Sequence, residues 1–206
     1  MIKYLIWDFD GVICNSKAIA FRNHNKICEK YGLPKIKEDA DYMQVINDKA
    51  LNKYISKDSI AKYYEEHRNL MLEECEKYNV FDKVIKFIGN IKVESIIITA
   101  TYEQIVKRVL RNNGYDYRKF KSIIGRETKG NKKDKITNLC KALNVDFSEI
   151  IYIGDTITDI EFCNELNIPV IAVGYGYCNP EVFNVEKTIK VCETEDMLIE
   201  CIKSII

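Results

Sequence analysis

The residues with the clearest chemical potential are two aspartates near the start of the chain, Asp8 and Asp10. They follow a short apolar run, Tyr4–Trp7, of the β-branched and aromatic kind that forms buried parallel strands. Carboxylates two residues apart lie on one side of an extended segment, so both can face one ion. Gly11 lets the chain turn away where a ligand needs access. Such a carboxylate can attack phosphorus beside a Mg²⁺ ion. The alternative interpretation of the same residues is a strand followed by an acidic turn without a chemical role.

More carboxylates follow a later apolar run at residues 150–153. Asp155 comes directly after this run, and Asp159 lies four residues further on, near the start of a predicted helix. Asp159 fits a helix N-cap equally well. Oxygen ligands without histidine or cysteine favour Mg²⁺ over zinc.

Two further segments could bind a phosphate group. Thr99 ends the apolar run at residues 93–98, and a hydroxyl beside a helix start suits a phosphate oxygen. A lysine-rich segment, residues 129–135 (KGNKKDK), precedes another predicted helix. A lysine there could bind both a phosphoryl group and a carboxylate, whereas the alternative is a solvated charged loop.

The elements that must position these residues alternate along the chain. Apolar runs predict strands at residues 4–7, 93–98, 120–124, 150–153, 169–173 and 188–191. Helical spacing predicts helices at residues 81–89, 102–113, 134–143, 160–166 and 194–205. This alternation is typical of an α/β fold with a parallel sheet covered by helices on both faces. The strands then end at one edge, where such sheets bind ligands.

The alternation is interrupted directly after the two first aspartates. Residues 16–79 have helical periodicity and no convincing strand, with helices predicted at 16–31, 39–53 and 59–75. We therefore expect a core domain formed by residues 1–15 and 80–206 and an inserted helical cap domain formed by residues 16–79.

Composition excludes several classes of protein. The 206 residues carry 31 basic and 31 acidic side chains, so nothing favours a nucleic-acid or membrane partner. Neither a membrane span nor a signal peptide is predicted. The eight cysteines are scattered without zinc-ligand spacing, which indicates free thiols in the cytoplasm. We expect a monomer or a weak homodimer.

Together these segments resemble the haloacid dehalogenase (HAD) superfamily. WDFDGVICNS is similar to its first motif, IIITAT to its second, the lysine segment to its third and IGDTITD to its fourth, in the same order. The helical block lies where this superfamily carries its C1 cap. The C-terminal half most resembles the phosphoglycolate phosphatase-like branch. The resemblance implies a Rossmann-like core and a phosphatase that needs Mg²⁺.

The resemblance also implies roles for the aspartates. Asp8 would be the nucleophile that forms an aspartyl-phosphate, and Asp10 would protonate the leaving oxygen and then activate water. Asp8, Asp155 and the Asp10 carbonyl would bind Mg²⁺, with support from Asp159.

Phosphate binding would fall to Thr99, Ala100 and one lysine. Lys132 and Lys133 are both eligible for the lysine position. Counting back from the apolar face of a helix that begins at Asp134 favours Lys133.

The substrate would be a small phosphorylated metabolite. A phosphomutase shares all four motifs, and a non-catalytic binding or regulatory protein on the same fold is the alternative from another class. Candidate specificity residues in the cap are Arg22, Asn23, Asn47, Lys49 and Arg68. Cationic groups in the cap would favour a second anionic group on the substrate, although each residue singly fits an ordinary solvated helix face.

Overall fold

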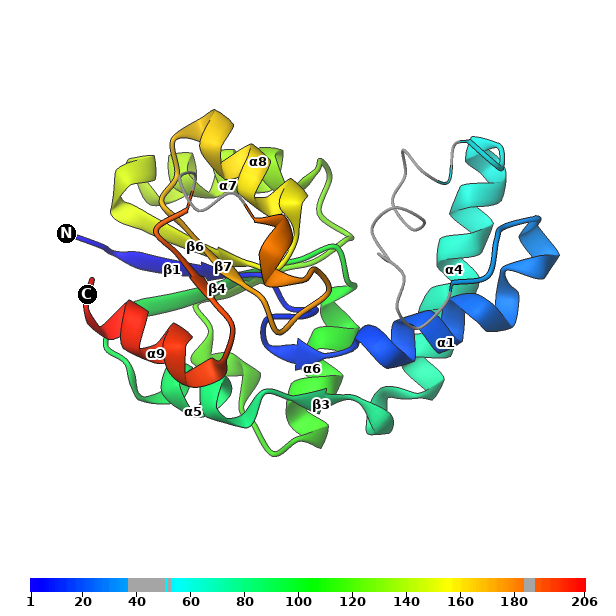
Figure 1. The fold of residues 1–206 in the computed structure, drawn as a ribbon, viewed down its shortest axis with the longest axis horizontal. Helices are drawn as coiled ribbons and strands as arrows, with labels where there is room; N and C mark the ends of the chain where they lie inside the picture. Colours follow the sequence, from blue (N-terminus) through cyan, green and yellow to red (C-terminus); the bar gives the residue numbers. More distant parts are fainter. Residues whose placement is uncertain (37–50, 52, 184–187) are drawn as a thin grey trace.

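The computed structural model describes residues 1–36, 51, 53–183 and 188–206. Its centre is a six-stranded sheet in the order β5-β4-β1-β6-β7-β8, in which every pairing is parallel (Figure 1). The strands are β1 (Tyr4–Trp7), β4 (Glu94–Ile98), β5 (Ser122–Ile124), β6 (Ile150–Gly154), β7 (Val170–Val173) and β8 (Lys190–Cys192). The predicted α/β fold is therefore confirmed.

Helices cover both faces of this sheet (Figure 1). They are α5 (Asp82–Asn90), α6 (Glu103–Asn112), α7 (Lys132–Leu143), α8 (Ile157–Leu166) and α9 (Glu195–Lys203). Side chains alternate along β1, so Leu5 and Trp7 pack with the apolar faces of α5, α6 and α9, whereas Ile6 packs with those of α7 and α8. Two apolar layers thus hold the central strand and fix the position of its carboxyl end.

The helical insertion enters and leaves through a short antiparallel ribbon. Its two strands are β2 (Cys14–Asn15) and β3 (Asn79–Val80), and Asn15 is paired with Asn79. Between them lie the helices α1 (Lys17–Ile27) and α4 (Lys57–Glu73), which pack against each other, and the short turns Glu29–Tyr31 and Cys75–Lys77. The predicted division at residues 15 and 80 coincides with this ribbon, and the division into two domains stays a prediction.

The two helices of the insertion share an apolar cluster and a group of ion pairs around the buried Glu74. Phe21 and Tyr63 belong to the apolar cluster. At the C-terminal end of α4, Glu74 pairs with Arg22 at 2.8 Å and with Lys26 at 2.7 Å. These contacts tie α1 to α4. The helix predicted at residues 39–53 lies almost wholly outside the described residues.

Across the part of the chain that the structure describes, no helix combines the length and apolar character that a membrane crossing requires. The eight cysteines are all buried and all free. Connections outside the main elements include the short turns Tyr117–Lys119, Phe147–Glu149 and Pro180–Val182.

Candidate active site

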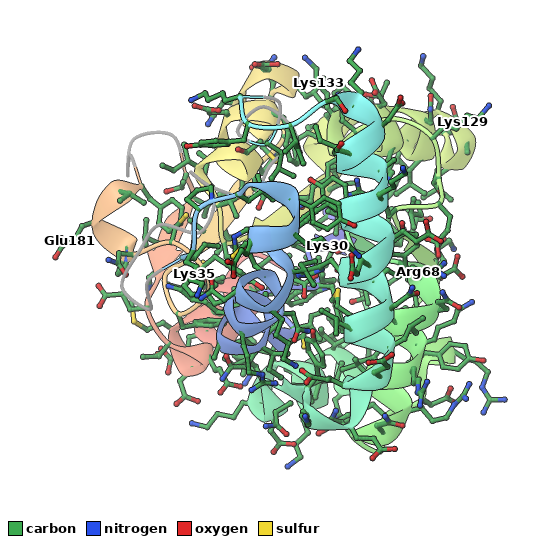
Figure 2. The ribbon with its side chains drawn as sticks, turned by 90° about the vertical axis from the view of Figure 1, so that its right-hand side faces the viewer. Lys30, Lys35, Arg68, Lys129, Lys133 and Glu181 are labelled. Carbon is green, nitrogen blue, oxygen red and sulfur yellow. The ribbon has the colours of Figure 1, made fainter. Side chains whose placement is uncertain are left out.

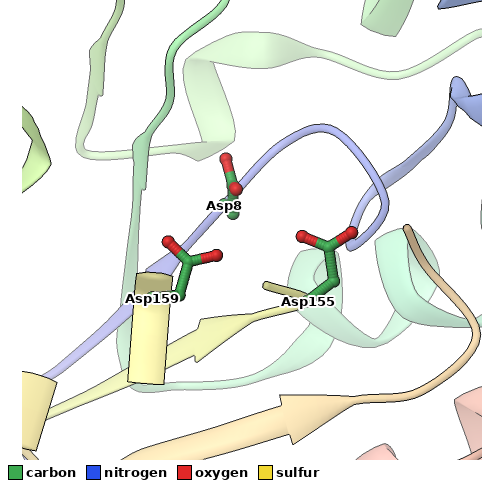
Figure 3. A group of neighbouring side chains, drawn as sticks. All are labelled: Asp8, Asp155 and Asp159. Carbon is green, nitrogen blue, oxygen red and sulfur yellow. The ribbon is translucent and has the colours of Figure 1, made fainter. Parts of the chain in front are cut away.

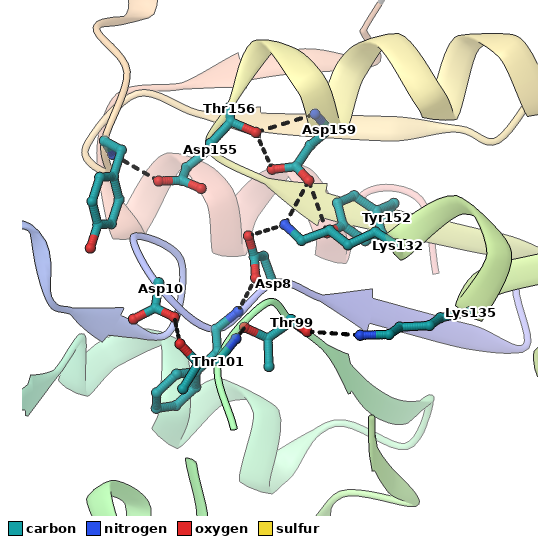
Figure 4. Close-up of polar contacts among 12 residues, drawn as sticks. Asp8, Asp10, Thr99, Thr101, Lys132, Lys135, Tyr152, Asp155, Thr156 and Asp159 are labelled. Carbon is teal, nitrogen blue, oxygen red and sulfur yellow. Dashed lines mark hydrogen bonds and ion pairs between the residues drawn. The ribbon is translucent and has the colours of Figure 1, made fainter. Parts of the chain in front are cut away.

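The carboxyl ends of three adjacent strands bring the predicted polar residues together. Asp8 follows β1, Thr99 follows β4 and Asp155 follows β6. Because β1 lies between β4 and β6 in the sheet, these side chains meet at one edge (Figure 4). The sheet topology therefore brings together residues that are far apart in the sequence: Asp8 and Asp155 are separated by 147 positions.

Three carboxylates form the acidic centre of this edge. One carboxylate oxygen from each of Asp8, Asp155 and Asp159 lies within 4.8 Å of the others. Figure 3 shows the three groups facing a common space. All three are buried, with exposures of 5%, 0% and 1%, respectively. Buried carboxylates in such proximity repel one another unless a cation lies among them.

Lys132 supplies one such cation. Its Nζ atom donates to Asp8 Oδ2 at 2.5 Å and to Asp159 Oδ1 at 2.8 Å (Figure 4). Lys133, by contrast, pairs with Glu165 at 2.6 Å on the surface, and Figure 2 shows it at the outer rim of the molecule. The structure therefore places Lys132, and not the preferred Lys133, at the acidic centre.

The reason is the start of α7. The helix begins at Lys132, not at Asp134, because Asn131 and Asp134 form a reciprocal capping box. Lys132 is therefore already in the first helical turn, four residues before the buried Ile136, and lies on the inner face. The sequence does carry a signal for this helix start, because Asn131 lies three residues before the acidic Asp134, as in a capping box.

Asp155 has room for a metal ion at one of its oxygens. Its Oδ2 atom accepts from the backbone N–H of Tyr177 at 2.7 Å. Its Oδ1 atom is buried and has no hydrogen-bond partner among the described residues. Gly11, at φ +74°, lies so close that a Cβ there would come within 1.8 Å of Oδ2. An unpartnered oxygen beside two other carboxylates fits a divalent cation such as Mg²⁺.

Asp10 is held by a residue that the sequence did not single out for this site. Thr101 donates its hydroxyl to Asp10 Oδ2 at 2.6 Å. The N–H of Thr101 in turn donates to Thr99 Oγ1 at 3.0 Å. Thr101 does not cap the following helix, because the N-cap of α6 is Tyr102. Ala100, between the two threonines, is exposed.

Burial governs the electrostatics of this group. It raises the pKa of Asp8 to about 7, against the lowering effect of the Lys132 ammonium. It also raises the pKa of Asp10, and it raises that of Asp155 far above the ordinary range, with the charges of Asp8 and Asp159 adding to the effect. Burial alone would lower the pKa of Lys132, but the two carboxylates outweigh it, so the net shift is upward. Lys132 alone therefore does not offset the cost of ionising all of these buried carboxyl groups.

The candidate specificity residues of the cap have different surroundings. Arg22 pairs with Glu74 at 2.8 Å. Asn23 is fully buried, and neither polar atom of its amide has a partner within the described chain. Arg68 lies over the Tyr102 ring, with its Cζ atom 5.3 Å from the ring centroid. The remaining two candidates, Asn47 and Lys49, lie outside the described residues.

Two contacts between the insertion and the rest of the chain were not anticipated. Tyr177, whose N–H binds Asp155, shares a hydrogen bond of 2.9 Å between its hydroxyl and that of Ser16, directly before α1. Arg126, after β5, lies 3.7 Å from the ring centroid of Tyr64 on α4. Neither contact has a sequence signal, because each depends on loops that meet only in the folded chain.

Comparisons with known proteins agree with this geometry. The chain is 21% identical over 193 residues to the N-acetylmuramic acid 6-phosphate phosphatase of Pseudomonas putida. This match spans 87% of this chain and 86% of that protein. It is 29% identical over 126 residues to the phosphoglycolate phosphatase of Thiobacillus denitrificans, a match that spans 58% of this chain and 52% of that protein. The structure of a predicted phosphatase from Clostridium acetobutylicum has the same fold, with a TM-score of 0.84, 17% identity and 100% of both chains covered.

The structure of a predicted phosphoglycolate phosphatase from Haemophilus somnus 129pt gives a TM-score of 0.79 at 16% identity, with 97% of both chains covered. The family model described as haloacid dehalogenase-like hydrolase matches residues 5–173, which include all four sequence motifs. The resemblance noted from those motifs is thus confirmed, and the chain belongs to the haloacid dehalogenase-like hydrolases.

Proposed function

We propose that this protein is a Mg²⁺-dependent phosphatase that hydrolyses a small phosphorylated metabolite through an aspartyl-phosphate on Asp8. The observation that carries the proposal is the contact of Lys132 with both Asp8 and Asp159, beside the unpartnered oxygen of Asp155. This arrangement combines a nucleophile, a fixed positive charge and a set of oxygen ligands in one buried place.

The reaction class has independent support. The chain belongs to a hydrolase family, and both curated relatives described above are phosphatases. These relatives indicate a phosphoric monoester hydrolase. The two relatives act on different phosphorylated compounds, so the reaction class is better supported than any one substrate.

In the first half of the proposed reaction, a carboxylate oxygen of Asp8 attacks phosphorus and the bond from phosphorus to the leaving oxygen breaks. Asp10 gives its proton to that leaving oxygen. Burial raises the pKa of Asp10, which favours the protonated form that this step requires. Lys132 and the Thr99 hydroxyl stabilise the negative charge of the transferring group.

In the second half, water attacks the phosphorus of the aspartyl-phosphate, and Asp10 now takes a proton from that water. The bond between phosphorus and the Asp8 oxygen breaks, which releases phosphate and restores the carboxylate. Thr101 holds Asp10 through its 2.6 Å hydrogen bond and so keeps the same carboxyl group in place for both proton transfers.

The residues that would hold Mg²⁺ are Asp8, Asp155 and Asp159, together with the backbone carbonyl of Asp10. When bound, the ion would offset the repulsion between Asp8 and the phosphoryl oxygens. The donor set contains oxygen only, as Mg²⁺ prefers.

The proposed selectivity for small substrates rests on the helical insertion, residues 16–79. It begins one residue after β2, and Ser16 contacts Tyr177 at the edge of the acidic centre. Of the two candidate arginines, we assign Arg68 to a second anionic group on the substrate, because Arg22 is already paired with Glu74. The cytoplasmic location and the monomeric or weakly dimeric state remain predictions.

The proposal is tested by measuring phosphate release from p-nitrophenyl phosphate by the purified protein, with Mg²⁺ and with excess chelator. We expect release that requires the metal and returns when Mg²⁺ is restored. A panel of phosphorylated metabolites then identifies the preferred substrate. Equal release with and without chelator would refute the metal dependence, and no release from any compound would refute the phosphatase.

A further inference from the structure

A second lysine of α7 is buried beside the site, and the proposed reaction does not use it. Lys135 is 5% exposed, and its Nζ atom donates to the carbonyl oxygen of Gly125 at 2.8 Å. The same atom lies 3.5 Å from the carbonyl oxygen of Thr99 (Figure 4). Lys135 thus links the chain at the ends of β4 and β5.

Among the described residues, no carboxylate forms an ion pair with this buried amino group. The ion pairs of α7 within the described chain are those of Lys132 and Lys133, and Lys135 takes part in none of them. Burial, and then the charges of Arg126 and Lys132, lower the pKa of Lys135. A buried amino group with only carbonyl partners costs folding free energy relative to an apolar side chain of similar size. Its benefit must therefore come from what it holds in place.

The carbonyl groups that Lys135 binds belong to a tightly packed support under the loop of residues 99–101, which contains the proposed phosphate-binding residue Thr99. A Cβ at Gly125 would lie 2.5 Å from the backbone N of Glu103 and 2.9 Å from the carbonyl oxygen of Thr101. The next residue, Arg126, donates its backbone N–H to that same Thr101 oxygen at 2.9 Å. A shift of Gly125 would therefore move Thr101.

The loop in turn orients two groups of the site. The Thr101 N–H binds the Thr99 hydroxyl at 3.0 Å, and the Thr101 hydroxyl binds Asp10 at 2.6 Å. Contacts thus run without a break from Lys135 through Thr99 and Gly125 to Asp10.

We infer that Lys135 is a positioning residue for phosphoryl binding. By holding the carbonyl oxygens of Thr99 and Gly125, it fixes the Thr99 hydroxyl against the phosphoryl group and the Thr101 hydroxyl against Asp10. This inference rests on the phosphoryl-transfer function proposed above. It assigns Lys135 no contact with the substrate and no part in metal binding.

The test compares Lys135→Met, which removes the donor, with Lys135→Arg, which keeps one. Lys141→Met makes the same change at an exposed position of the same helix and is the matched control. For each protein, calorimetry measures the affinity for inorganic phosphate with Mg²⁺ present, and the affinity for Mg²⁺ alone. Hydrolysis of p-nitrophenyl phosphate gives kcat and KM, and thermal unfolding reports the fold.

We expect Lys135→Met to weaken phosphate binding about tenfold, as the loss of a buried hydrogen bond would. The kcat should also fall, while the affinity for Mg²⁺ is unchanged. Lys135→Arg should recover part of the phosphate affinity, and Lys141→Met should match the wild type. If Lys135→Met does not fold, Gly125→Ala disturbs the same support with Lys135 in place and should weaken phosphate binding in the same way.

Unchanged phosphate affinity in a folded Lys135→Met, or in Gly125→Ala if it is used, would overturn the inference. So would a loss of Mg²⁺ affinity equal to the loss of phosphate affinity, because that result means general damage to the site. If the wild type binds phosphate but hydrolyses no ester, the proposed function is refuted instead. The phosphate affinities of the variants then still test the positioning role of Lys135. A wild type that binds no phosphate overturns both.

Discussion

Lys132 lies between two carboxylates, whereas its neighbour Lys133 pairs with Glu165 at the surface. Lys132→Met should lower kcat/KM for an aryl phosphate by about a hundredfold or more, because a fixed charge at the transferring group is lost and two buried carboxylates lose their cation. Lys133→Met should leave kcat/KM within about twofold of the wild type, as for other surface changes. Steady-state kinetics of the two variants at one saturating Mg²⁺ concentration make the comparison.

The two lysine variants carry the same substitution at adjacent positions, so general effects of lost charge cancel. The assignment fails if Lys133→Met is the more damaged of the pair, or if both retain wild-type turnover.

Thr101 contributes a hydroxyl whose partner is Asp10. Thr101→Val keeps the shape of the side chain and removes only that hydrogen bond, so Asp10 should become less well placed for proton transfer. Turnover should fall about tenfold for an alkyl phosphate, whose leaving oxygen needs the proton, and less for p-nitrophenyl phosphate. Thr137→Val, which removes a hydroxyl bonded to the Lys133 carbonyl, is the matched control. Equal losses on the two substrates would argue against this role for Thr101.

The sequence predicted the aspartates better than the lysine, for a physical reason. Asp8 and Asp155 directly follow apolar strands, and the sheet topology alone brings strand ends together. To identify the lysine at the site, one must know at which residue α7 begins. A capping box determines that residue, whereas the apolar pattern of the helix does not. Thr101 could not be assigned because its partner is 91 residues away in sequence.

The six strands of the sheet were all predicted within a few residues, because apolar side chains fill most of their positions. The ribbon formed by β2 and β3 was missed as strands, since two-residue strands carry no periodicity. The α1 and α4 helices were anticipated from their apolar spacing, but the ion pairs of Glu74 that join them were not.

Glu74 makes the stability of the helical insertion sensitive to acid. Hydrogen bonds from Lys26 and Arg22 lower its pKa from 4.5 to about 2. A carboxyl group with a lowered folded-state pKa stabilises the fold above its unfolded pKa, and this contribution is lost as the pH falls from 4.5 towards 2. Glu74→Gln removes this contribution, so it should lower the free energy of unfolding at pH 7 by about 2 kcal/mol. The loss is not larger because solvent screens the partly exposed cationic partners of Glu74. Denaturant titrations at several pH values measure this.

The exposed neighbour Glu73 on α4 is the control, and Glu73→Gln should change the free energy by less than about 0.5 kcal/mol. The difference between Glu74→Gln and the wild type should shrink as the pH approaches 2. A difference that stays constant over this pH range would show that Glu74 acts through packing and not through its charge.

The molecule as a whole places its buried group of three carboxylates next to a helical insertion. Asp8 is 5% exposed and Asp155 is fully buried, and the insertion is joined to the core at the ribbon of β2 and β3. We expect efficient hydrolysis of small phosphorylated metabolites and none of a folded phosphoprotein, because a bulky substrate could not bring its phosphate to Asp8. Phosphate release from both kinds of substrate at equal concentrations tests this, and efficient release from the phosphoprotein would contradict the role of the insertion as a cap.

The account depends most on covalent chemistry at Asp8. In the proposed mechanism Asp10 activates water, so in Asp10→Asn an enzyme-bound phosphate should accumulate when the leaving group of the substrate needs no proton. The decisive measurement is therefore acid quenching of Asp10→Asn with p-nitrophenyl phosphate and Mg²⁺, followed by peptide mass spectrometry. We predict phosphate on the peptide that contains Asp8, and none when Asp8→Asn is added to the same variant. Hydrolysis by the wild type with no phosphorylated Asp8 under these conditions, or phosphate at another residue, would contradict the mechanism.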